Sequence, residues 1–132
     1  MIVMNITRHT EVGDKVWKAT NFWARMKGLI GTSKLRKGEG LLLPRCIGIH
    51  MFGMSYPLDV IYLDENNEVI ALLENIQPNT FGLIKLHAKS VLELRVGTIK
   101  KSKTQIGDVL SVDGVIEAIE APKVPIPLLR FI

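Results

Sequence analysis

The segment 44–54 concentrates the side chains of this sequence that could do chemistry. It reads PRCIGIHMFGM, with a thiol at Cys46, an imidazole at His50 and a thioether at Met54. Residues two and four positions apart share a face of an extended strand, so all three side chains would line one side if this segment is extended. Sulfur and imidazole ligands on one face suit a soft transition metal.

The number of these ligands argues against a metal centre. A structural zinc site takes four such ligands, and the segment offers one cysteine and one histidine. Cysteine is also common in cores as a small hydrophobe, and methionine as a flexible filler of gaps. The sequence therefore predicts no metal or other cofactor, with a soft transition metal at Cys46 and His50 as the alternative.

Asp59 interrupts the apolar run PLDVIYL, on the strand face that it shares with Ile61 and Leu63. A partly buried carboxylate needs hydrogen bonds or a cation, because its pKa otherwise rises. One interpretation is a structural anchor that is satisfied by backbone amides, His50 or Arg25. The other is a general base or a ligand-binding carboxylate. No second carboxylate lies nearby in the sequence, which favours the anchor.

An enzyme built on these residues would use Cys46 as nucleophile, His50 as base and Asp59 as orienting group. The sequence contains neither a nucleophile elbow nor a glycine-rich phosphate loop to accompany them. We therefore expect a noncatalytic domain, and we keep the Cys46, His50 and Asp59 enzyme as the alternative.

Charge is distributed unevenly along the chain. Residues 1–45 carry nine basic and three acidic side chains, whereas residues 46–84 carry five acidic side chains and no basic ones. The net charge is +4. A modest excess without clustered aromatic side chains does not indicate a nucleic-acid surface, so nucleic-acid binding through the basic ends is the less favoured alternative.

Two short basic groups stand out within this distribution. They consist of Lys34, Arg36 and Lys37, and of Lys100, Lys101 and Lys103. The two groups could converge on an anion. Solvated faces around loops are the simpler interpretation.

Length and cysteine content bound the organisation of the chain. Its 132 residues suit one globular domain, which we place at 1–120, followed by a proline-bearing extended tail at 121–132. A single cysteine excludes an intrachain disulfide, which favours a reducing compartment. No signal-peptide core and no apolar run of membrane-spanning length occur. The expected location is the cytoplasm, without a membrane partner.

Apolar runs of strand length, bounded by Gly, Pro and Asn, dominate the chain. Strands are predicted at 2–5, 15–19, 40–43, 47–52, 58–63, 69–73, 91–95 and 109–112. The four runs from 40 to 73 are expected to form the central sheet. Hairpin turns are expected at 12–14 and 64–68, and an irregular connection from 78 to 86. Helical turns are predicted at 22–26 and 97–103.

Short strands with hairpin-sized links indicate an α+β domain with a mostly antiparallel sheet and one or two short helices. A partly closed barrel is one arrangement of such strands. The pattern does not favour a doubly wound parallel sheet.

A series of motifs resembles that of a known family. The motifs are RMKGLIG at 25–31, EGLLL at 39–43, the segment 46–54, PLDV at 57–60, VLEL at 91–94 with Gly97 and Thr98, and IGD at 106–108. Their order, from about residue 16 to 112, is similar to that of domain of unknown function family 192. The resemblance implies a compact, sheet-rich bacterial or archaeal domain and implies no particular reaction.

The predicted binding site follows from the same motifs. Arg25, His50, Met54 and Asp59 match motif positions, and Cys46 lies in the same segment as His50. Unusual polar and sulfur side chains within an otherwise apolar sheet indicate a ligand site. We therefore predict a noncatalytic accessory domain that binds an unidentified small ligand or protein partner at these five residues.

Overall fold

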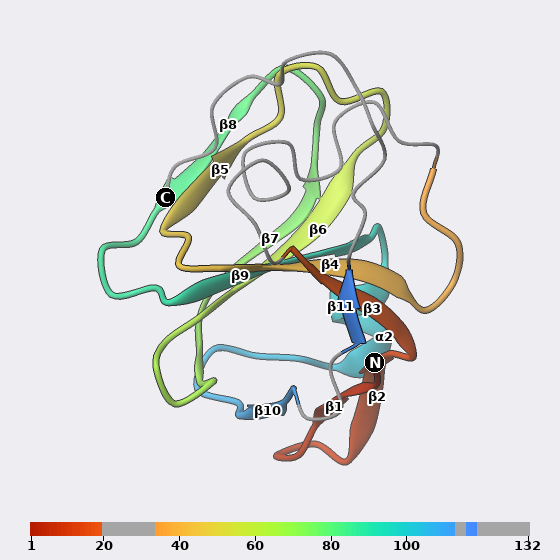
Figure 1. Cartoon of the computed structure of the whole chain (residues 1–132), viewed down its shortest axis with the longest axis vertical. Coiled ribbons are helices and arrows are strands. Elements are labelled where there is room, and N and C mark those ends of the chain that lie inside the picture. Colours follow the sequence, from red (N-terminus) through yellow and green to blue (C-terminus); the bar gives the residue numbers. More distant parts are fainter. Residues whose placement is uncertain (20–33, 113–115, 119–132) are drawn as a thin grey trace.

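The computed structural model describes residues 1–19 and 34–112, together with the backbone of 116–118. In these residues the chain forms three sheets and one short helix, α2 (Thr98–Ser102) (Figure 1). The strands are β1 (Val3–Asn5), β2 (Thr10–Gly13), β3 (Lys15–Ala19), β4 (Glu39–Pro44), β5 (Gly48–His50), β6 (Leu58–Leu63), β7 (Val69–Ile76), β8 (Phe81–Ile84), β9 (Ser90–Arg95), β10 (Leu110–Ser111) and β11 (Ile116–Ala118). The predicted helix at 22–26 and tail at 121–132 lie outside the described residues.

A six-stranded central sheet has the order β11-β3-β4-β9-β6-β7. Strands β4, β9, β6 and β7 pair antiparallel, whereas β3 runs parallel to both β4 and β11. All six residues of β6 are buried. Both faces of β6 are therefore buried. This explains the nearly continuous apolar run of the strand, because side chains on either face pack into a core.

The two faces of the central sheet bury separate cores. On one face Val60 and Tyr62 of β6 pack with Cys46 and Ile49. On the other face the alternate residue Ile61 packs with side chains of β1 and α2. The β5–β8 pair lies above the central sheet in Figure 1, and β1, β2, β10 and α2 lie below it. Neighbouring residues of β6 therefore point into different environments.

The predicted fold class is confirmed, with one difference in the central sheet. The described strands form a mostly antiparallel arrangement with a single short helix and no closed barrel. The predicted strand at 47–52 is shorter and lies outside the central sheet, where β5 pairs with β8 instead. Arg45 with φ 52° and Gly53 with φ 84° turn the chain on either side of β5, which explains its length.

The hairpin predicted at 12–14 is wrong. The structure pairs β1 with β2 through a turn over 6–9, in which His9 takes a left-handed φ of 58°. Gly13 instead allows the chain to pass close to the backbone of Gly38, because a Cβ at position 13 would lie 3.0 Å from the carbonyl oxygen of Gly38. The region 78–86, predicted to be irregular, contains β8.

The turn predicted at 64–68 is confirmed between β6 and β7. The carboxylate of Asp64 accepts hydrogen bonds from the amides of Asn66 and Glu68, and Asn67 has φ 59°. Its acidic residues therefore serve the turn itself. In the described part of the chain, no helix has the length and apolar character needed to cross a membrane.

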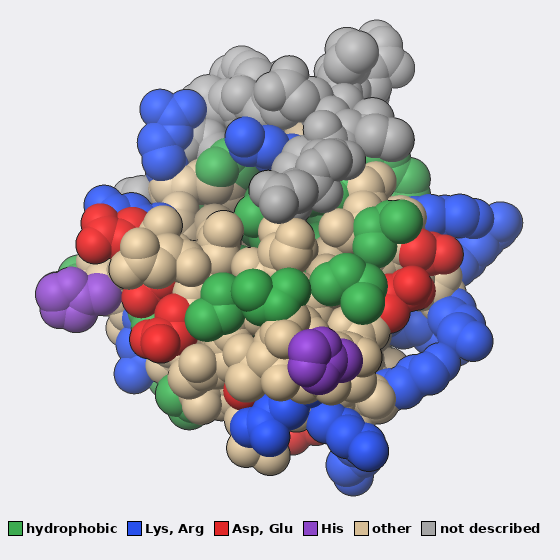
Figure 2. All heavy atoms as spheres, turned by 90° about the horizontal axis from the view of Figure 1, so that it is seen from below, with side chains coloured by type: hydrophobic (Ala, Val, Ile, Leu, Met, Phe, Trp, Pro, Cys, Tyr) green, Lys and Arg blue, Asp and Glu red, His purple; other side chains and the backbone are tan. Residues whose placement is uncertain are grey.

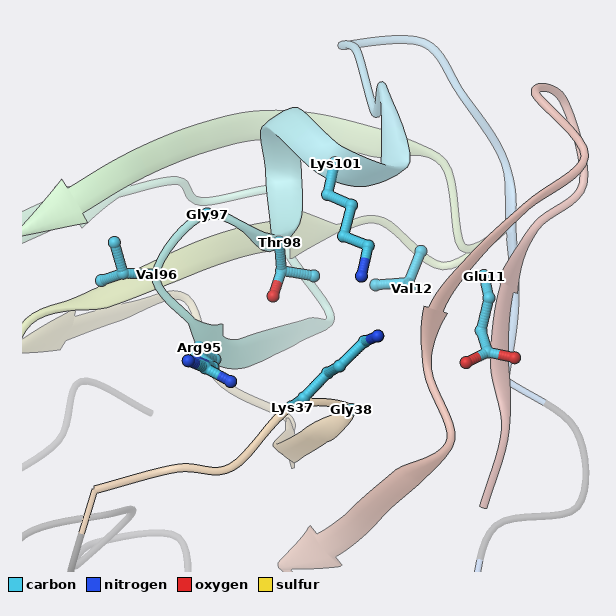
Figure 3. A pocket seen from close by; sticks show the side chains of 9 residues that line it. All are labelled: Glu11, Val12, Lys37, Gly38, Arg95, Val96, Gly97, Thr98 and Lys101. Carbon is cyan, nitrogen blue, oxygen red and sulfur yellow. The ribbon is translucent and has the colours of Figure 1, made fainter.

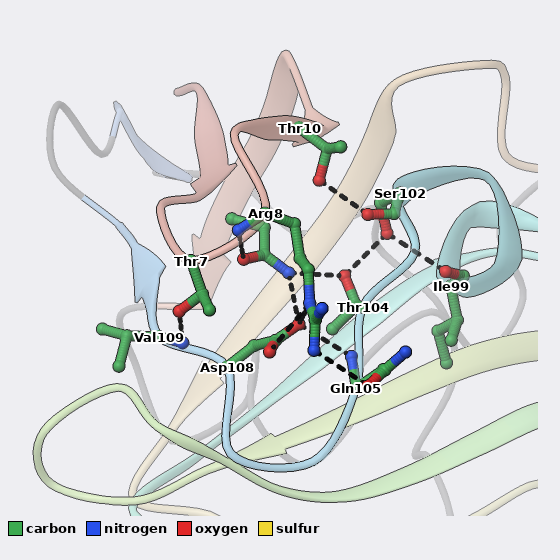
Figure 4. Close-up of polar contacts among 10 residues, drawn as sticks. Thr7, Arg8, Thr10, Ile99, Ser102, Thr104, Gln105, Asp108 and Val109 are labelled. Carbon is green, nitrogen blue, oxygen red and sulfur yellow. Dashed lines mark hydrogen bonds and ion pairs between the residues drawn. The ribbon is translucent and has the colours of Figure 1, made fainter.

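A buried polar network joins the first strand to the segment after α2 (Figure 4). The carboxylate of Asp108 accepts hydrogen bonds from Nδ2 of Asn5 at 2.9 Å, Nε of Arg8 at 3.1 Å and the amide of Gln105 at 2.9 Å. Thr104 accepts a further bond from Asn5. The network fixes the N-terminal layer beneath the central sheet.

We expect Asp108→Asn to lower the free energy of unfolding by about 1–3 kcal/mol at neutral pH. Burial alone would raise the pKa of Asp108, but the bonds from Arg8, Asn5 and the Gln105 amide together outweigh burial and lower it. A lowered folded-state pKa contributes stability above the unfolded value, and this contribution is lost as the pH falls through the folded value. Urea unfolding should therefore show a difference between variant and native chain that shrinks below about pH 4.

Glu65→Gln, in the exposed β6–β7 turn, is the control for loss of one carboxylate. A constant difference between native chain and Asp108→Asn from pH 7 to pH 3 would contradict the ionic role of Asp108.

Candidate functional site

A pocket of about 600 Å³ opens between β2, the loop before β4 and the turn that joins β9 to α2 (Figure 3). The residues that line it are Glu11, Val12, Lys37, Gly38, Arg95, Val96, Gly97, Thr98 and Lys101. Small-ligand sites typically have volumes of about 300–1,000 Å³. Three segments far apart in the sequence thus form one concavity of ligand size.

The carboxylate of Asp59 positions the turn between β9 and α2. Its Oδ2 accepts hydrogen bonds from the amides of Gly97 at 3.1 Å and Ile99 at 2.9 Å, and its Oδ1 accepts one from Asn75 at 2.9 Å. Gly97 has φ 94°, a conformation that glycine adopts readily. These bonds fix the backbone of the turn. Arg95, which lies just before the turn, is thereby placed in the wall of the pocket.

The second wall is the Lys37–Gly38 loop. The carbonyl oxygen of Gly38 accepts hydrogen bonds from the amides of Asp14 at 3.1 Å and Lys15 at 2.9 Å. Gly38 has φ 83°, so a side chain there would be strained. The parallel pairing of β3 with β4 continues from this contact and places Lys37 beside the pocket.

The third wall is β2, which the Thr10 hydroxyl ties to α2. That hydroxyl donates a 2.6 Å hydrogen bond to the carbonyl oxygen of Ser102, at the end of the helix. The next residues of β2, Glu11 and Val12, line the pocket opposite Lys101. The hydroxyls of Ser102 and Thr104, 2.7 Å apart, connect this end of the helix to Asn5 and so to the Asp108 network.

Positive charge converges in the pocket. Lys37, Arg95 and Lys101 are exposed to solvent, and Figure 3 shows the amino groups of Lys37 and Lys101 pointing toward one another. The close amino group of Lys37, through direct contact and charge repulsion, lowers the pKa of Lys101. Arg95 acts in the same direction, whereas Glu11 opposes it. The lining thus combines three cations with one carboxylate.

The lower face of the molecule also carries many basic groups. Figure 2 shows the molecule from below, where lysine and arginine side chains project around much of the rim. Like charges that converge without an equal number of anions raise the local positive potential. An anion placed between Lys37 and Lys101 would relieve their repulsion.

The structure separates the residues of the predicted site. Asp59 lies on the α2 side of the central sheet, where it bonds the amides of Gly97 and Ile99. Cys46 and Met54 belong to the core on the opposite face. The side chains of Asp59 and Cys46 therefore lie on opposite faces of the central sheet, so Asp59 is not brought together with Cys46 as a catalytic group. The anchoring interpretation of Asp59 by backbone amides is confirmed.

Cys46 and His50 are both buried. The thiol of Cys46 donates a 3.0 Å hydrogen bond to the carbonyl oxygen of Gly48, and Nδ1 of His50 accepts one from the amide of Phe52 at 3.2 Å. The predicted alternation along 46–54 is wrong, because Cys46, Ile49 and Met54 enter the same core. The turns at Arg45 and Gly53 interrupt the extended backbone that alternation requires.

Arg25 lies outside the described residues, so its place relative to His50 and Met54 stays a prediction. Among the described side chains, no group of three or more His, Cys, Asp or Glu could hold a metal ion. The soft-metal alternative at Cys46 and His50 has no further ligand from this set.

The pocket includes residues that the motif analysis did not select. The two basic groups in the sequence contain Lys37 and Lys101, which the structure brings together, whereas Arg36, Lys100 and Lys103 are exposed and do not line the pocket. Arg95 is the last residue of β9, after its buried residues, and no sequence motif marked it as a binding residue.

We expect Asp59→Ala to lower the free energy of unfolding by about 3 kcal/mol or more, because three backbone amides would lose their acceptor. Asp64→Ala is the matched control, since Asp64 accepts two amides in an exposed turn. Asp64→Ala should lower the free energy of unfolding by about 1 kcal/mol. Urea unfolding at pH 7 measures both. Equal losses would show that the Asp59 bonds contribute little to the fold.

Comparison with known proteins identifies relatives of this chain. Residues 4–112 match the sequence model of DUF192, described as an uncharacterized ACR. A UPF0127 protein from Thermococcus sibiricus is 35% identical over 103 residues, which cover 71% of this chain and 66% of that relative. The match thus spans slightly less than two thirds of the relative's length.

Two crystal structures share the fold. A protein of unknown function from Novosphingobium aromaticivorans is 21% identical, with a TM-score of 0.67 over 83% of this chain and 81% of its own. A protein from Sinorhizobium meliloti, provisionally described as a transcription regulator, is 22% identical, with a TM-score of 0.72 over 83% of this chain and 89% of its own. The family match and the motif order agree, and the chain belongs to the DUF192 family.

Proposed function

We propose that this chain is a noncatalytic domain that binds a small anionic ligand in the pocket between β2, the Lys37–Gly38 loop and the β9–α2 turn. The observation that carries the proposal is the convergence of Lys37, from the loop before β4, with Arg95 and Lys101, from either side of the β9–α2 turn. The cytoplasmic location expected from the single cysteine is part of the same proposal.

The charge of the pocket favours a dianion such as a phosphate group. Three basic side chains against Glu11 leave an excess of two positive charges. A phosphate monoester carries about −1.5 to −2 charges at pH 7. Arginine can present two parallel donors to such a group, and lysine acts as a point charge. The hydroxyl of Thr98, which points into the pocket in Figure 3, is a further donor.

A binding role without catalysis agrees with the other groups of the pocket. Among the described residues that line it there is no histidine and no cysteine, and the one carboxylate belongs to Glu11. Asp59, which could have acted as a base, has both carboxylate oxygens engaged with backbone amides. The described lining therefore supplies binding groups without an evident pair of acid and base.

Nucleic acid is the alternative ligand, and one structural relative is provisionally described as a transcription regulator. Binding along a strand would require basic side chains spread over an extended surface. The three cations of this pocket instead meet in one concavity. This arrangement supports a compact anion better than a polymer.

We expect inorganic pyrophosphate to bind the full chain with an affinity that Arg95→Gln and Lys101→Gln each reduce about tenfold or more, since a charge-assisted hydrogen bond contributes about 1.5–3 kcal/mol. Lys100→Gln is the matched control, because Lys100 lies on the same helix and is exposed but does not line the pocket. Isothermal titration calorimetry at low ionic strength measures all four proteins.

Salt and pH supply two further checks on the same titration. Affinity should fall with added salt, because the cations are exposed and screened. It should also fall as the pH rises through the range where Lys101 loses its proton, which begins below the usual lysine range because of its lowered pKa. Absent binding, or an equal loss in Lys100→Gln, would refute the proposal.

A further inference from the structure

A second, smaller pocket adjoins the basic one. Its volume is about 340 Å³, and the residues that line it are Lys34, Leu35, Ser55, Tyr56, Pro57, Arg95 and Val96. Arg95 and Val96 line both pockets, so the two concavities share one wall. That wall is the chain segment that leaves the end of β9.

The two pockets differ in chemistry. The basic pocket gathers Lys37, Lys101 and Arg95, whereas Leu35, Tyr56 and Pro57 give the smaller pocket carbon-rich walls. Tyr56 and Leu35 are buried and belong to the core above the central sheet, which holds them in place. A preformed apolar wall favours a ring or another apolar group, because its contact removes apolar surface from water.

We infer that the ligand is a phosphate monoester of an apolar or aromatic group, with its phosphate in the basic pocket and its organic group in the smaller one. This inference rests on the proposed function of the basic pocket. The shared wall supports it, since Arg95 can reach the phosphate while Val96 contacts the organic group. Val96 is 38% exposed and so presents apolar surface at this junction.

The position of Lys34 refines the ligand class. Lys34 is exposed and lines the smaller pocket, and none of the other described residues that line it is acidic. An ammonium group beside an apolar wall can donate to a carbonyl, ring nitrogen or hydroxyl of the ligand. A ring that bears a polar acceptor fits this pocket better than a plain alkyl chain.

Phenyl phosphate and methyl phosphate form a matched pair of probes, because they carry the same phosphate and differ in the organic group. We expect the full chain to bind phenyl phosphate about tenfold more tightly than methyl phosphate, which corresponds to a difference of about 1.4 kcal/mol in binding free energy. Ser55→Trp should remove this preference by filling the smaller pocket, while pyrophosphate affinity stays as in the native chain. Ser55 is exposed, so the substitution does not alter the core.

Asn66→Trp, in the exposed β6–β7 turn outside both pockets, is the control and should keep the preference. Amide chemical shifts give a second readout that needs no variant, since only phenyl phosphate should move the signals of Ser55 and Tyr56. Equal affinities of the two esters, with pyrophosphate still bound, would overturn this inference alone. A lower affinity of Ser55→Trp for pyrophosphate would indicate instead that a diphosphate binds across both pockets. Failure of all three probes to bind would overturn the proposed function as well.

Discussion

Asp59 carries a buried carboxylate whose two oxygens accept hydrogen bonds from three backbone amides, and the candidate pocket depends on this interaction. A buried carboxylate is costly unless such donors surround it. Here the donors come from β7, from Gly97 in the turn after β9 and from Ile99 in the first turn of α2. The bonds hold Gly97 at a positive φ and set the direction in which the chain leaves β9. Arg95 and Thr98 flank that turn, so their placement follows from an anchor that itself does not line the pocket.

The central sheet divides the molecule into two environments with different chemistry. Above it, Cys46 and Met54 complete an apolar core. Below it, the Asp108 network and the Asp59 anchor satisfy buried polar groups and fix the layer that carries β2 and α2. Hydrogen bonds to Asp59 and to the Gly38 carbonyl oxygen thus hold in place the backbone segments that carry the three pocket cations.

Much of the fold could be predicted from local patterns. The runs at 15–19 and 58–63 matched β3 and β6 because length, apolar content and flanking turn residues agreed there. Strand β8 was missed because it is only four residues long and contains Gly82, which weakens a strand pattern. The hairpin at 12–14 failed because Gly13 meets Gly38, a contact between distant segments. The pocket was hidden for the same reason, since Lys37 and Lys101 meet only after β3 and β4 pair in parallel.

The most direct test of anion binding in this pocket is a titration of the isotope-labelled full chain with inorganic phosphate, followed by amide chemical shifts. We expect the largest changes at Gly38, Gly97, Thr98 and Lys101, with little change at His50 and Met54 on the other side of the sheet. Largest changes at His50 and Met54, or no saturable change at the pocket, would contradict it.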